Sequence, residues 1–138
     1  MLFRSNGTYT VVTSGMALDD PGSSTTTTQL TTATPTGTSD QKWVFTAQSD
    51  GSYQILNASS GECVDLYYSS LTAGAVIQQF GCTGNKNQHW ILTPLSGGGY
   101  SISSSVSGLL ITTASTASGA LVTQQANTNS ALQQWTIS

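Results

Sequence analysis

The tripeptide Gln-x-Trp occurs three times in this chain at nearly equal intervals. Its tryptophans are Trp43, Trp90 and Trp135, which lie 47 and 45 residues apart. A second motif keeps the same interval, namely a tyrosine that closely follows a glycine and begins an alternation of apolar and polar residues. Its three copies are Tyr9-Thr10-Val11, Tyr53-Gln54-Ile55 and Tyr100-Ser101-Ile102. Two motifs at one period predict a structure made of three repeats of about 45 residues.

The segments between these motifs are short and alternating, and Gly, Ser, Asn and Pro separate them, which is typical of strands joined by turns. One such unit cannot bury its own apolar side chains, so three must share a core. We therefore predict an all-β fold in which repeats at about 7–47, 48–95 and 96–138 each contribute about four strands to a closed barrel. Residues 1–138 would form one domain. A propeller is excluded because three units are too few to close it.

The three tryptophans are expected to fill the centre of this core, because each can bury a large apolar area. The glutamine of each motif should bond to the backbone of its own repeat, so that its amide is not left unpaired. The Ser/Thr-rich run 23–39 has the composition of a flexible linker, but Leu30 keeps the apolar position of Ile77 and Val122. We therefore assign that run to the inner strands and loop of the first repeat.

Charge argues against two classes of partner. Only 7% of the residues are charged, the formal net charge is −3, and the basic side chains are Arg4, Lys42 and Lys86. Proteins that grip nucleic acid or anionic membrane surfaces need clusters of cations. No apolar run approaches the roughly 20 residues of a membrane span. We expect neither nucleic-acid binding nor membrane insertion.

Three Gln-x-Trp repeats at this period resemble the ricin B-type β-trefoil lectins, a family that is also grouped with carbohydrate-binding modules. The resemblance spans about residues 7–138 and implies a β-trefoil that binds carbohydrate and is not an enzyme. The middle repeat is similar to the best-preserved sugar-binding repeats of these lectins. The similar segments are Gly61-Glu62-Cys63-Val64-Asp65, the run 75–82 that ends in Phe80-Gly81-Cys82, and Asn85-Lys86-Asn87-Gln88.

This resemblance assigns roles to five residues. Asp65 would accept hydrogen bonds from two neighbouring sugar hydroxyls, Phe80 would stack on the C–H face of the sugar, and Asn87 would donate to a hydroxyl. Gln88 would brace the carboxylate, and Gln78 lies on the strand that leads to the aromatic. These residue types suit a sugar, which has hydroxyls at its edge and one apolar face. We expect alanine substitutions of Asp65, Phe80 and Asp19 to leave stability intact, because these residues should lie at the surface, away from the tryptophan core.

The surroundings of this constellation are less sharply defined by sequence. Tyr67 and Tyr68 follow Asp65 closely, and they either line the same site or are simple packing residues. The first repeat retains Asp19 and Asp40 where the middle repeat has Asp65 and Asn87. It has no aromatic residue to match Phe80, so it predicts a weaker second site.

The third repeat has lost the same constellation. Thr112, Gln125 and Leu132 stand where the acid, the aromatic and the asparagine are expected. We predict that it is silent in the usual binding mode, so that one chain is close to monovalent. Avidity would then require a homodimer or tandem attachment.

The two cysteines, Cys63 and Cys82, are 19 residues apart and are either free thiols or one disulfide. The lysine-poor, Ser/Thr-rich composition resembles that of extracellular microbial proteins, which favours the disulfide and a secreted location. The first five residues are too short for a signal peptide, so any such peptide is absent or already removed, and the cytoplasm is the alternative location.

The favoured ligand is galactose, N-acetylgalactosamine or a β-galactoside. The alternative is a polysaccharide-targeting module of a glycoside hydrolase, directed to xylan, arabinan or galactan. A β-trefoil protease inhibitor is the alternative of another class.

An enzyme has little support in the sequence, and no metal or cofactor is expected. The only histidine, His89, occupies the variable position of Gln-x-Trp, where alternation points it away from the core. The carboxylate pairs Asp19 with Asp20 and Glu62 with Asp65 have no catalytic motif behind them.

Overall fold

The computed structural model describes residues 6–138, so Arg4 and the other residues before Asn6 lie outside it. Within 6–138 the chain forms short strands and single-turn 3-10 helices, with no α-helix. The middle and third repeats contribute four strands each. These are β7 (Tyr53–Asn57), β8 (Cys63–Leu66), β9 (Ile77–Phe80), β10 (Trp90–Pro94), β11 (Tyr100–Ser104), β12 (Leu110–Thr113), β13 (Ala120–Gln125) and β14 (Thr136–Ile137).

The first repeat contains six strands in place of four. They are β1 (Gly7–Tyr9), β2 (Val11–Thr13), β3 (Met16–Asp19), β4 (Thr28–Gln29), β5 (Thr31–Ala33) and β6 (Trp43–Ala47). Two expected strands are each interrupted by one residue, Thr10 and Leu30. Each interruption marks a change of partner, because β1 pairs with β6 while β2 pairs with β14, and β4 pairs with β9 while β5 pairs with β3 and β13.

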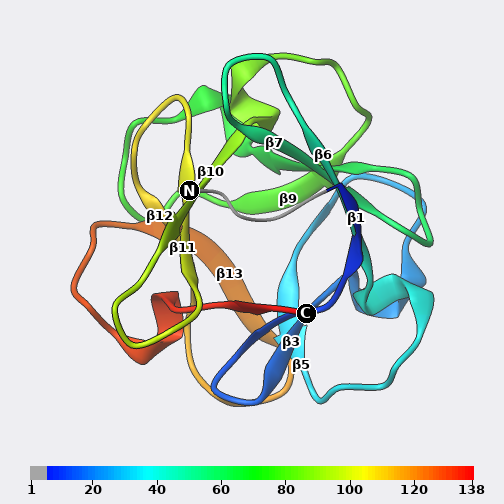
Figure 1. Ribbon diagram of the computed structural model, residues 1–138. Helices are drawn as coiled ribbons and strands as arrows, with labels where there is room; N and C mark the ends of the chain where they lie inside the picture. The colour runs from blue at the N-terminus through cyan, green and yellow to red at the C-terminus, as the bar shows by residue number, and fades with distance from the viewer. Residues whose placement is uncertain (1–5) are drawn as a thin grey trace.

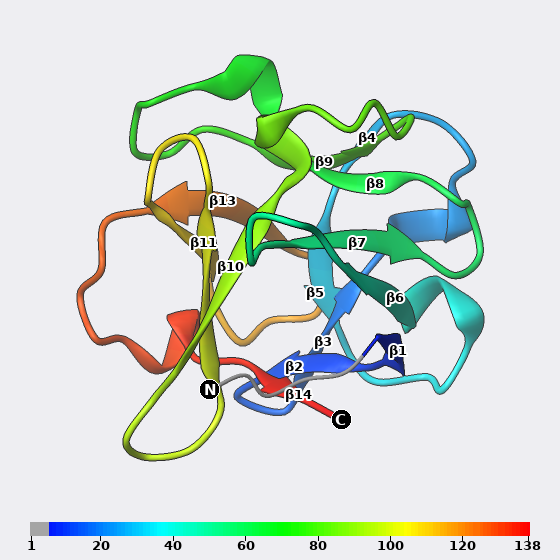
Figure 2. The same cartoon turned by 45° about the horizontal axis from the view of Figure 1, so that its top comes forward.

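All strand pairs are antiparallel and belong to one sheet that winds around a common centre. Figure 1 shows the three groups of strands and loops arranged around that centre, and Figure 2 shows β8, β9 and β4 side by side. The ring is closed where Thr10 and Ser138 exchange backbone hydrogen bonds of 2.9 and 3.1 Å. This is the all-β closed arrangement that the repeats predict and the β-trefoil that the resemblance implies.

The tryptophans fill the core as expected. Trp43, Trp90 and Trp135 are all 0% exposed. Each indole nitrogen donates a 3.0 Å hydrogen bond to a carbonyl oxygen of a neighbouring strand, namely that of Leu18, Val64 or Ile111. The same contact in every repeat satisfies the one polar atom of each buried ring.

Leu30 lies where the repeats meet. It is completely buried, as are its counterparts Ile77 and Val122, so the run 23–39 does belong to the folded first repeat. The Leu30 N–H donates to the Ile77 carbonyl at 3.0 Å, and the Leu30 carbonyl accepts from Val122 at 3.0 Å. One residue thus joins strands of all three repeats.

Two buried glutamines each hold one loop of the preceding repeat. The Gln79 amide donates to the Ser24 and Thr26 carbonyls at 3.0 and 2.9 Å. The Gln124 amide makes the equivalent bonds, of 3.0 and 2.9 Å, to the loop of the middle repeat. Loops of one repeat are therefore held against the outer strands of the next.

None of the helices within residues 6–138 is long and apolar enough to cross a membrane.

Candidate functional site

The hairpin of β8 and β9 presents the predicted residues on one face. Asp65 pairs with Gln78 across the two strands, and Cys63 pairs with Phe80. Because side chains two residues apart share a face of a strand, all four point the same way. The intervening residues, Val64 and Gln79, are completely buried on the opposite face. The alternation of the two strands therefore creates the site.

The Asp65 carboxylate is held by three amide donors. Gln78 donates to Oδ1 at 3.1 Å, and Gln88 and Asn87 donate to Oδ2 at 2.8 and 3.2 Å. A carboxylate has about four lone-pair sites. Among the described residues Oδ1 receives only the Gln78 bond, so it retains the capacity to accept a hydroxyl of a ligand. The sequence-predicted acid is thus fixed in direction before any ligand arrives.

Burial shapes the electrostatics of this group. Asp65 is only 3% exposed, and burial raises the pKa of its carboxyl above the ordinary 3.8, while bonds from Gln88, Gln78 and Asn87 oppose that rise. The surface position expected for Asp65 is therefore wrong, as it is for Asp19 at 8% exposed, and it no longer supports the prediction that substitution spares stability. Removal of Asp65 would leave three buried or half-buried donors without their acceptor.

Asn87 has a different role from the one expected. One N–H of its amide donates to Asp65, and the other donates to the Leu66 carbonyl at 3.1 Å. Both donors are therefore used within the protein. The group that Asn87 can offer to a ligand is its carbonyl oxygen, which accepts a hydrogen bond.

Gln88 links the site to the core. It lies in the 3-10 helix η4 (Lys86–Gln88), two residues before Trp90. Its Oε1 accepts from the Thr83 N–H at 2.8 Å, and its amide donates to the Gly81 carbonyl at 2.9 Å as well as to Asp65. Gln41 and Gln133 make the same pair of backbone contacts in their repeats. The expected bracing of the fold by these glutamines is confirmed, and in the middle repeat it extends to the carboxylate.

Aromatic rings lie around the carboxylate. Phe80 is 41% exposed, and Tyr67 and Tyr68 in the 3-10 helix η3 (Tyr67–Ser69) are 44% and 85% exposed, with ring centroids 4.4 Å apart. They border one cavity of about 660 Å³ together with the polar residues. Its lining consists of Thr27, Asp65, Tyr67, Tyr68, Ser69, Gln78, Phe80, Thr83, Asn85, Lys86, Asn87 and Val106. Both tyrosines therefore line the same cavity as Asp65.

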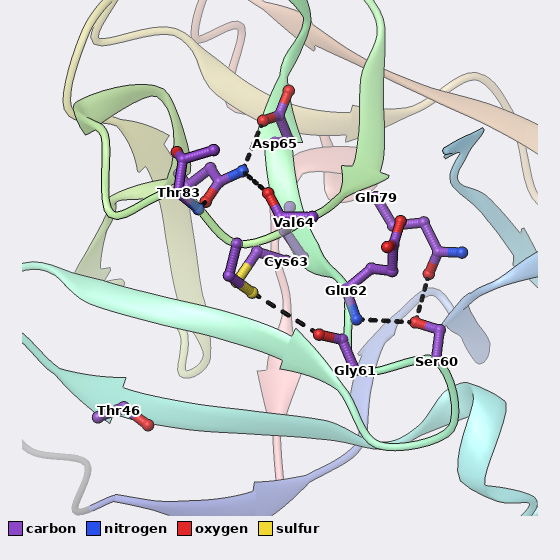
Figure 3. Close-up of a disulfide and its surroundings, with 12 residues drawn as sticks. Thr46, Ser60, Gly61, Glu62, Cys63, Val64, Asp65, Gln79 and Thr83 are labelled. Carbon is purple, nitrogen blue, oxygen red and sulfur yellow. Dashed lines mark hydrogen bonds between the residues drawn. A yellow bond between two sulfur atoms is a disulfide. The ribbon is translucent and has the colours of Figure 1, made fainter. Parts of the chain in front are cut away.

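Cys63 and Cys82 form a disulfide, as the composition favoured. Figure 3 shows it beside Asp65, at the start of β8. The bridge joins β8 to the segment that follows β9. It thereby fixes both ends of the hairpin that carries Asp65 and Phe80.

The first repeat lacks several parts of this arrangement. Asp19 pairs with Thr31 across the strands, and Ala33 stands where Phe80 stands in the middle repeat. Asp40 accepts hydrogen bonds from Ser23, at 2.9 Å, and from the Thr38 hydroxyl, so both carboxylate oxygens already have partners in their own loop. The first repeat therefore has both acids, but it has Ala33 and not an aromatic ring at the position where a sugar would stack.

Asp20 is an acid whose environment the sequence did not reveal. It is completely buried, and neither carboxylate oxygen has a hydrogen-bond partner. Burial, together with the nearby carboxylates of Asp19 and Asp40, raises its pKa to about 6. Donors from Ser24 and Gln79 act in the opposite direction without reaching hydrogen-bond geometry. Aligning the repeats could have drawn attention to it, because the middle repeat has apolar Leu66 at the same place.

The third repeat has no acid in this position. Thr112 takes the place of Asp65 and accepts from the Gln133 amide at 3.2 Å, and Gln125 stands where Phe80 is. A hollow of about 30 Å³ borders Gln133, far smaller than the cavity of the middle repeat.

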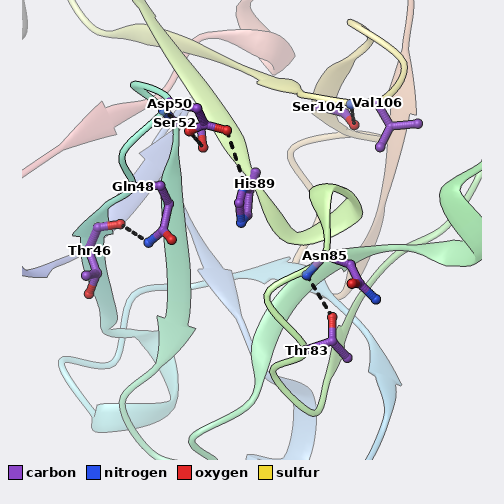
Figure 4. Close-up of polar contacts among 9 residues, drawn as sticks. All are labelled: Thr46, Gln48, Asp50, Ser52, Thr83, Asn85, His89, Ser104 and Val106. Carbon is purple, nitrogen blue, oxygen red and sulfur yellow. Dashed lines mark hydrogen bonds and ion pairs between the residues drawn. The ribbon is translucent and has the colours of Figure 1, made fainter.

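The side chains beside His89 are not arranged to activate a nucleophile. His89 Nδ1 lies 3.4 Å from Oδ2 of Asp50, and Ser52 donates a 2.6 Å bond to Oδ1 of the same carboxylate (Figure 4). The serine hydroxyl therefore faces the acid and not the imidazole, which is the wrong order for activating a nucleophile. Among residues 6–138 no group of three or more His, Cys, Asp or Glu side chains is arranged to hold a metal ion.

Comparison with protein families places this geometry in a known context. The profile described as ricin-type beta-trefoil lectin domain-like matches residues 2–80, 41–125 and 86–138, overlapping stretches that together span almost the whole chain. A comparison with curated protein sequences gave no significant match.

Solved structures agree on the fold. The designed threefold-symmetric protein ThreeFoil is 30% identical, with a TM-score of 0.91, and the alignment covers 94% of this chain and 96% of that one. The exo-beta-1,3-galactanase 1,3Gal43A of Clostridium thermocellum is also 30% identical, with a TM-score of 0.85. The match covers 94% of this chain and only 29% of the galactanase. A Polyporus squamosus lectin, solved with a sialylated human-type influenza-binding epitope, is 24% identical, with a TM-score of 0.81, over 99% of this chain and 50% of the lectin.

Proposed function

This chain belongs to the ricin-type β-trefoil lectin domain-like family, and on that basis we propose that it binds carbohydrate through the cavity of its middle repeat. The observation that carries this proposal is the Asp65 carboxylate, held by three amides with acceptor capacity to spare, in a cavity that it shares with the exposed ring of Phe80. Sugar hydroxyls would bond to Asp65 and Asn87, and the C–H face of the same ring would rest on Phe80.

The binding energy expected from these groups is modest. A stacked phenyl face that covers roughly 50 Å² of apolar surface is worth about 1 kcal/mol. Charge-assisted hydrogen bonds to a carboxylate contribute about 1.5 to 3 kcal/mol. After the cost of association, a Kd near 1 mM, or about 4 kcal/mol, is expected for one sugar. With one complete site per chain, tight binding to a surface would need a second copy of the domain.

We propose galactose, N-acetylgalactosamine or a β-galactoside as the ligand. The resemblance of Asp65, Phe80, Asn87 and Gln88 to the sugar-binding repeats of ricin-like lectins supports this choice. A glycan array tests it directly. Binding to xylo-oligosaccharides without any galactoside would overturn the proposed sugar while leaving carbohydrate binding intact.

A polysaccharide-targeting module is the second candidate. It is favoured by the 30% identity to an exo-beta-1,3-galactanase of which this chain matches less than a third, because the domain would then correspond to a non-catalytic part of a larger enzyme. Retention of the isolated domain on insoluble galactan or xylan, compared with its affinity for free galactose, distinguishes the two. A protease panel tests the remaining alternative, a β-trefoil inhibitor.

We propose that the domain has no catalytic role and that it is extracellular. The Ser52–Asp50–His89 order supports the first statement. The Cys63–Cys82 disulfide supports the second, because such bridges persist in oxidising compartments.

A further inference from the structure

The cavity extends beyond the residues that would hold one sugar. Besides the Asp65 constellation it is bordered by Thr27 from the first repeat and Val106 from the third. Its volume of about 660 Å³ lies well inside the range of roughly 300 to 1,000 Å³ that is typical of sites for drug-sized ligands. Because residues of all three repeats line the cavity, part of its wall lies outside the β8–β9 hairpin. We call this part, which includes Tyr68, Lys86 and Val106, the outer part of the cavity.

Tyr68 occupies a backbone conformation that tyrosine rarely adopts. Its φ is +48° and its ψ is 30°, in the left-handed region, and the following Ser69 is also left-handed at φ +51°. The equivalent position in the first repeat is Gly22, at φ +69°, where no Cβ opposes the conformation. Strain of this kind is concentrated at functional sites.

Packing does not account for the tyrosine at this position. The side chain is 85% exposed, and its ring contact is with Tyr67, whose ring is itself 44% exposed. A glycine would relieve the backbone at little loss of buried area. The ring is therefore better explained by a ligand that covers it in the cavity.

Val106 supplies a second apolar surface, since its side chain packs in part against the hydrophobic core and also borders the cavity. It follows β11 in a turn fixed by a 3.0 Å bond from its own N–H to the Ser104 hydroxyl (Figure 4). The neighbouring Ser105 N–H donates to the His89 carbonyl at 3.1 Å, which docks this turn beside η4. The middle repeat has Ser59 at the equivalent position, so the apolar side chain is particular to the turn that borders the cavity.

Lys86 adds a polar group to the same region. It is the first residue of η4, one position before Asn87, and it lines the cavity. An ammonium group donates three hydrogen bonds and accepts none. That complements the inner site, where Asp65 and Asn87 offer mainly acceptors.

We propose that Tyr68, Val106 and Lys86 form an outer subsite for a second sugar unit, so that the middle repeat recognises a saccharide of at least two residues. This inference rests on the proposed function, because the first unit is the one held at Asp65. The apolar groups would cover C–H surface of the second unit, and Lys86 would donate to its hydroxyls.

Calorimetry with matched sugars tests the proposal on the whole 138-residue chain. The probes are galactose with β-1,3-galactobiose, and xylose with xylobiose. The protein should bind one of these two pairs. Within that pair the disaccharide should bind about fivefold more tightly than the monosaccharide, because the outer subsite covers a second sugar face. Val106→Ser should reduce this ratio to about twofold or less while leaving the Kd of the monosaccharide within about twofold of wild type. Tyr68→Gly should also lower the ratio.

The two variants carry residues that the other repeats use at the same positions, so both should fold, and circular dichroism checks this. Ile91→Ser is the control, because Ile91 is 42% exposed and does not line the cavity. It should leave the ratio unchanged. Equal affinity of wild type for mono- and disaccharide, or an equal loss for both in Val106→Ser, would overturn the outer subsite alone. Absence of binding to all four sugars would overturn the proposed function and the subsite with it.

Discussion

Gln88 donates a 2.8 Å hydrogen bond to Oδ2 of Asp65 while its own Oε1 accepts one of 2.8 Å from the Thr83 N–H. The glutamine stands two residues before Trp90, which is 0% exposed. One of the three amides that hold the carboxylate is thus fixed to the backbone beside a completely buried core residue. Such preorganisation lowers the cost of ordering the site when a ligand binds.

Asp65→Ala should abolish sugar binding and also destabilise the fold. Loss of the charge-assisted bonds to the ligand costs about 1.5 to 3 kcal/mol, which makes millimolar binding undetectable. The donors left behind, chiefly those of Gln78 and Gln88, should lower the free energy of unfolding by about 1 to 3 kcal/mol. Calorimetry and urea denaturation measure the two effects. Asp19→Ala is the matched control and should bind sugar like wild type. The opposite result for the two variants would move the site to the first repeat.

Phe80→Ala should weaken binding without affecting stability. The ring is 41% exposed, so its loss removes the platform and little core packing. Affinity should fall by about 1 kcal/mol, or roughly fivefold. The free energy of unfolding should change by less than about 0.5 kcal/mol, as for other surface substitutions. Ile91→Ala, at a similarly exposed position outside the cavity, should change neither quantity. Unchanged affinity in Phe80→Ala would remove the stacking role.

Asp20→Asn should stabilise the protein at neutral pH. The folded-state pKa of about 6 lies above the ordinary 3.8, so the folded state binds the proton more tightly than the unfolded state. The contribution of this group to stability is therefore complete below about pH 3.8 and is lost as the pH rises through about 6. An uncharged amide should avoid this loss, which is on the order of 2 to 3 kcal/mol above pH 6.

Urea denaturation between pH 3 and pH 7.5 measures the effect of Asp20→Asn. Wild type should lose stability across the window from about pH 4 to 6, and the variant should lose less. Asp50→Asn is the control, because hydrogen bonds from Ser52 lower the pKa of that exposed carboxyl to about 2, outside the window. Identical pH profiles for wild type and Asp20→Asn would show that Asp20 is not the responsible group.

Both cysteines of the chain should be oxidised in the disulfide, so that no free thiol remains. Thiol titration of the unreduced, unfolded protein should find essentially no reactive group, and two equivalents would contradict the bridge. Replacing both Cys63 and Cys82 by serine should lower the free energy of unfolding by about 3 kcal/mol, as expected for a loop of this length. Sugar binding should survive below the melting temperature, since neither sulfur lines the cavity.

The features that repeat along the chain could be predicted from sequence. Trp43, Trp90 and Trp135 recur at a fixed interval because each occupies an equivalent place in one core, and the fold follows from that interval. Asp65 and Phe80 could be proposed because both lie within one hairpin, where strand alternation decides which side chains share a face.

The features that depend on contacts between distant parts of the chain could not be predicted from sequence. Thr27 and Val106 reach the cavity only because neighbouring repeats dock against the middle one. The fate of the Asn87 amide was also missed, although both partners lie in the middle repeat, because it depends on the position of the Leu66 carbonyl 21 residues earlier, which no local pattern gives. The division of strands at Thr10 and Leu30 likewise reflects partners far away in the chain, Ser138 and Ile77.

The hydrogen bonds between Thr10 and Ser138 have a consequence for biosynthesis. A polypeptide translated only as far as Trp135 still lacks β14, so β2 has no partner on that side and the ring stays open. Closure joins positions 128 residues apart, which is the kind of long-range contact that forms late and slowly. The domain therefore cannot close during synthesis until residues 136–138 have left the exit tunnel of the ribosome.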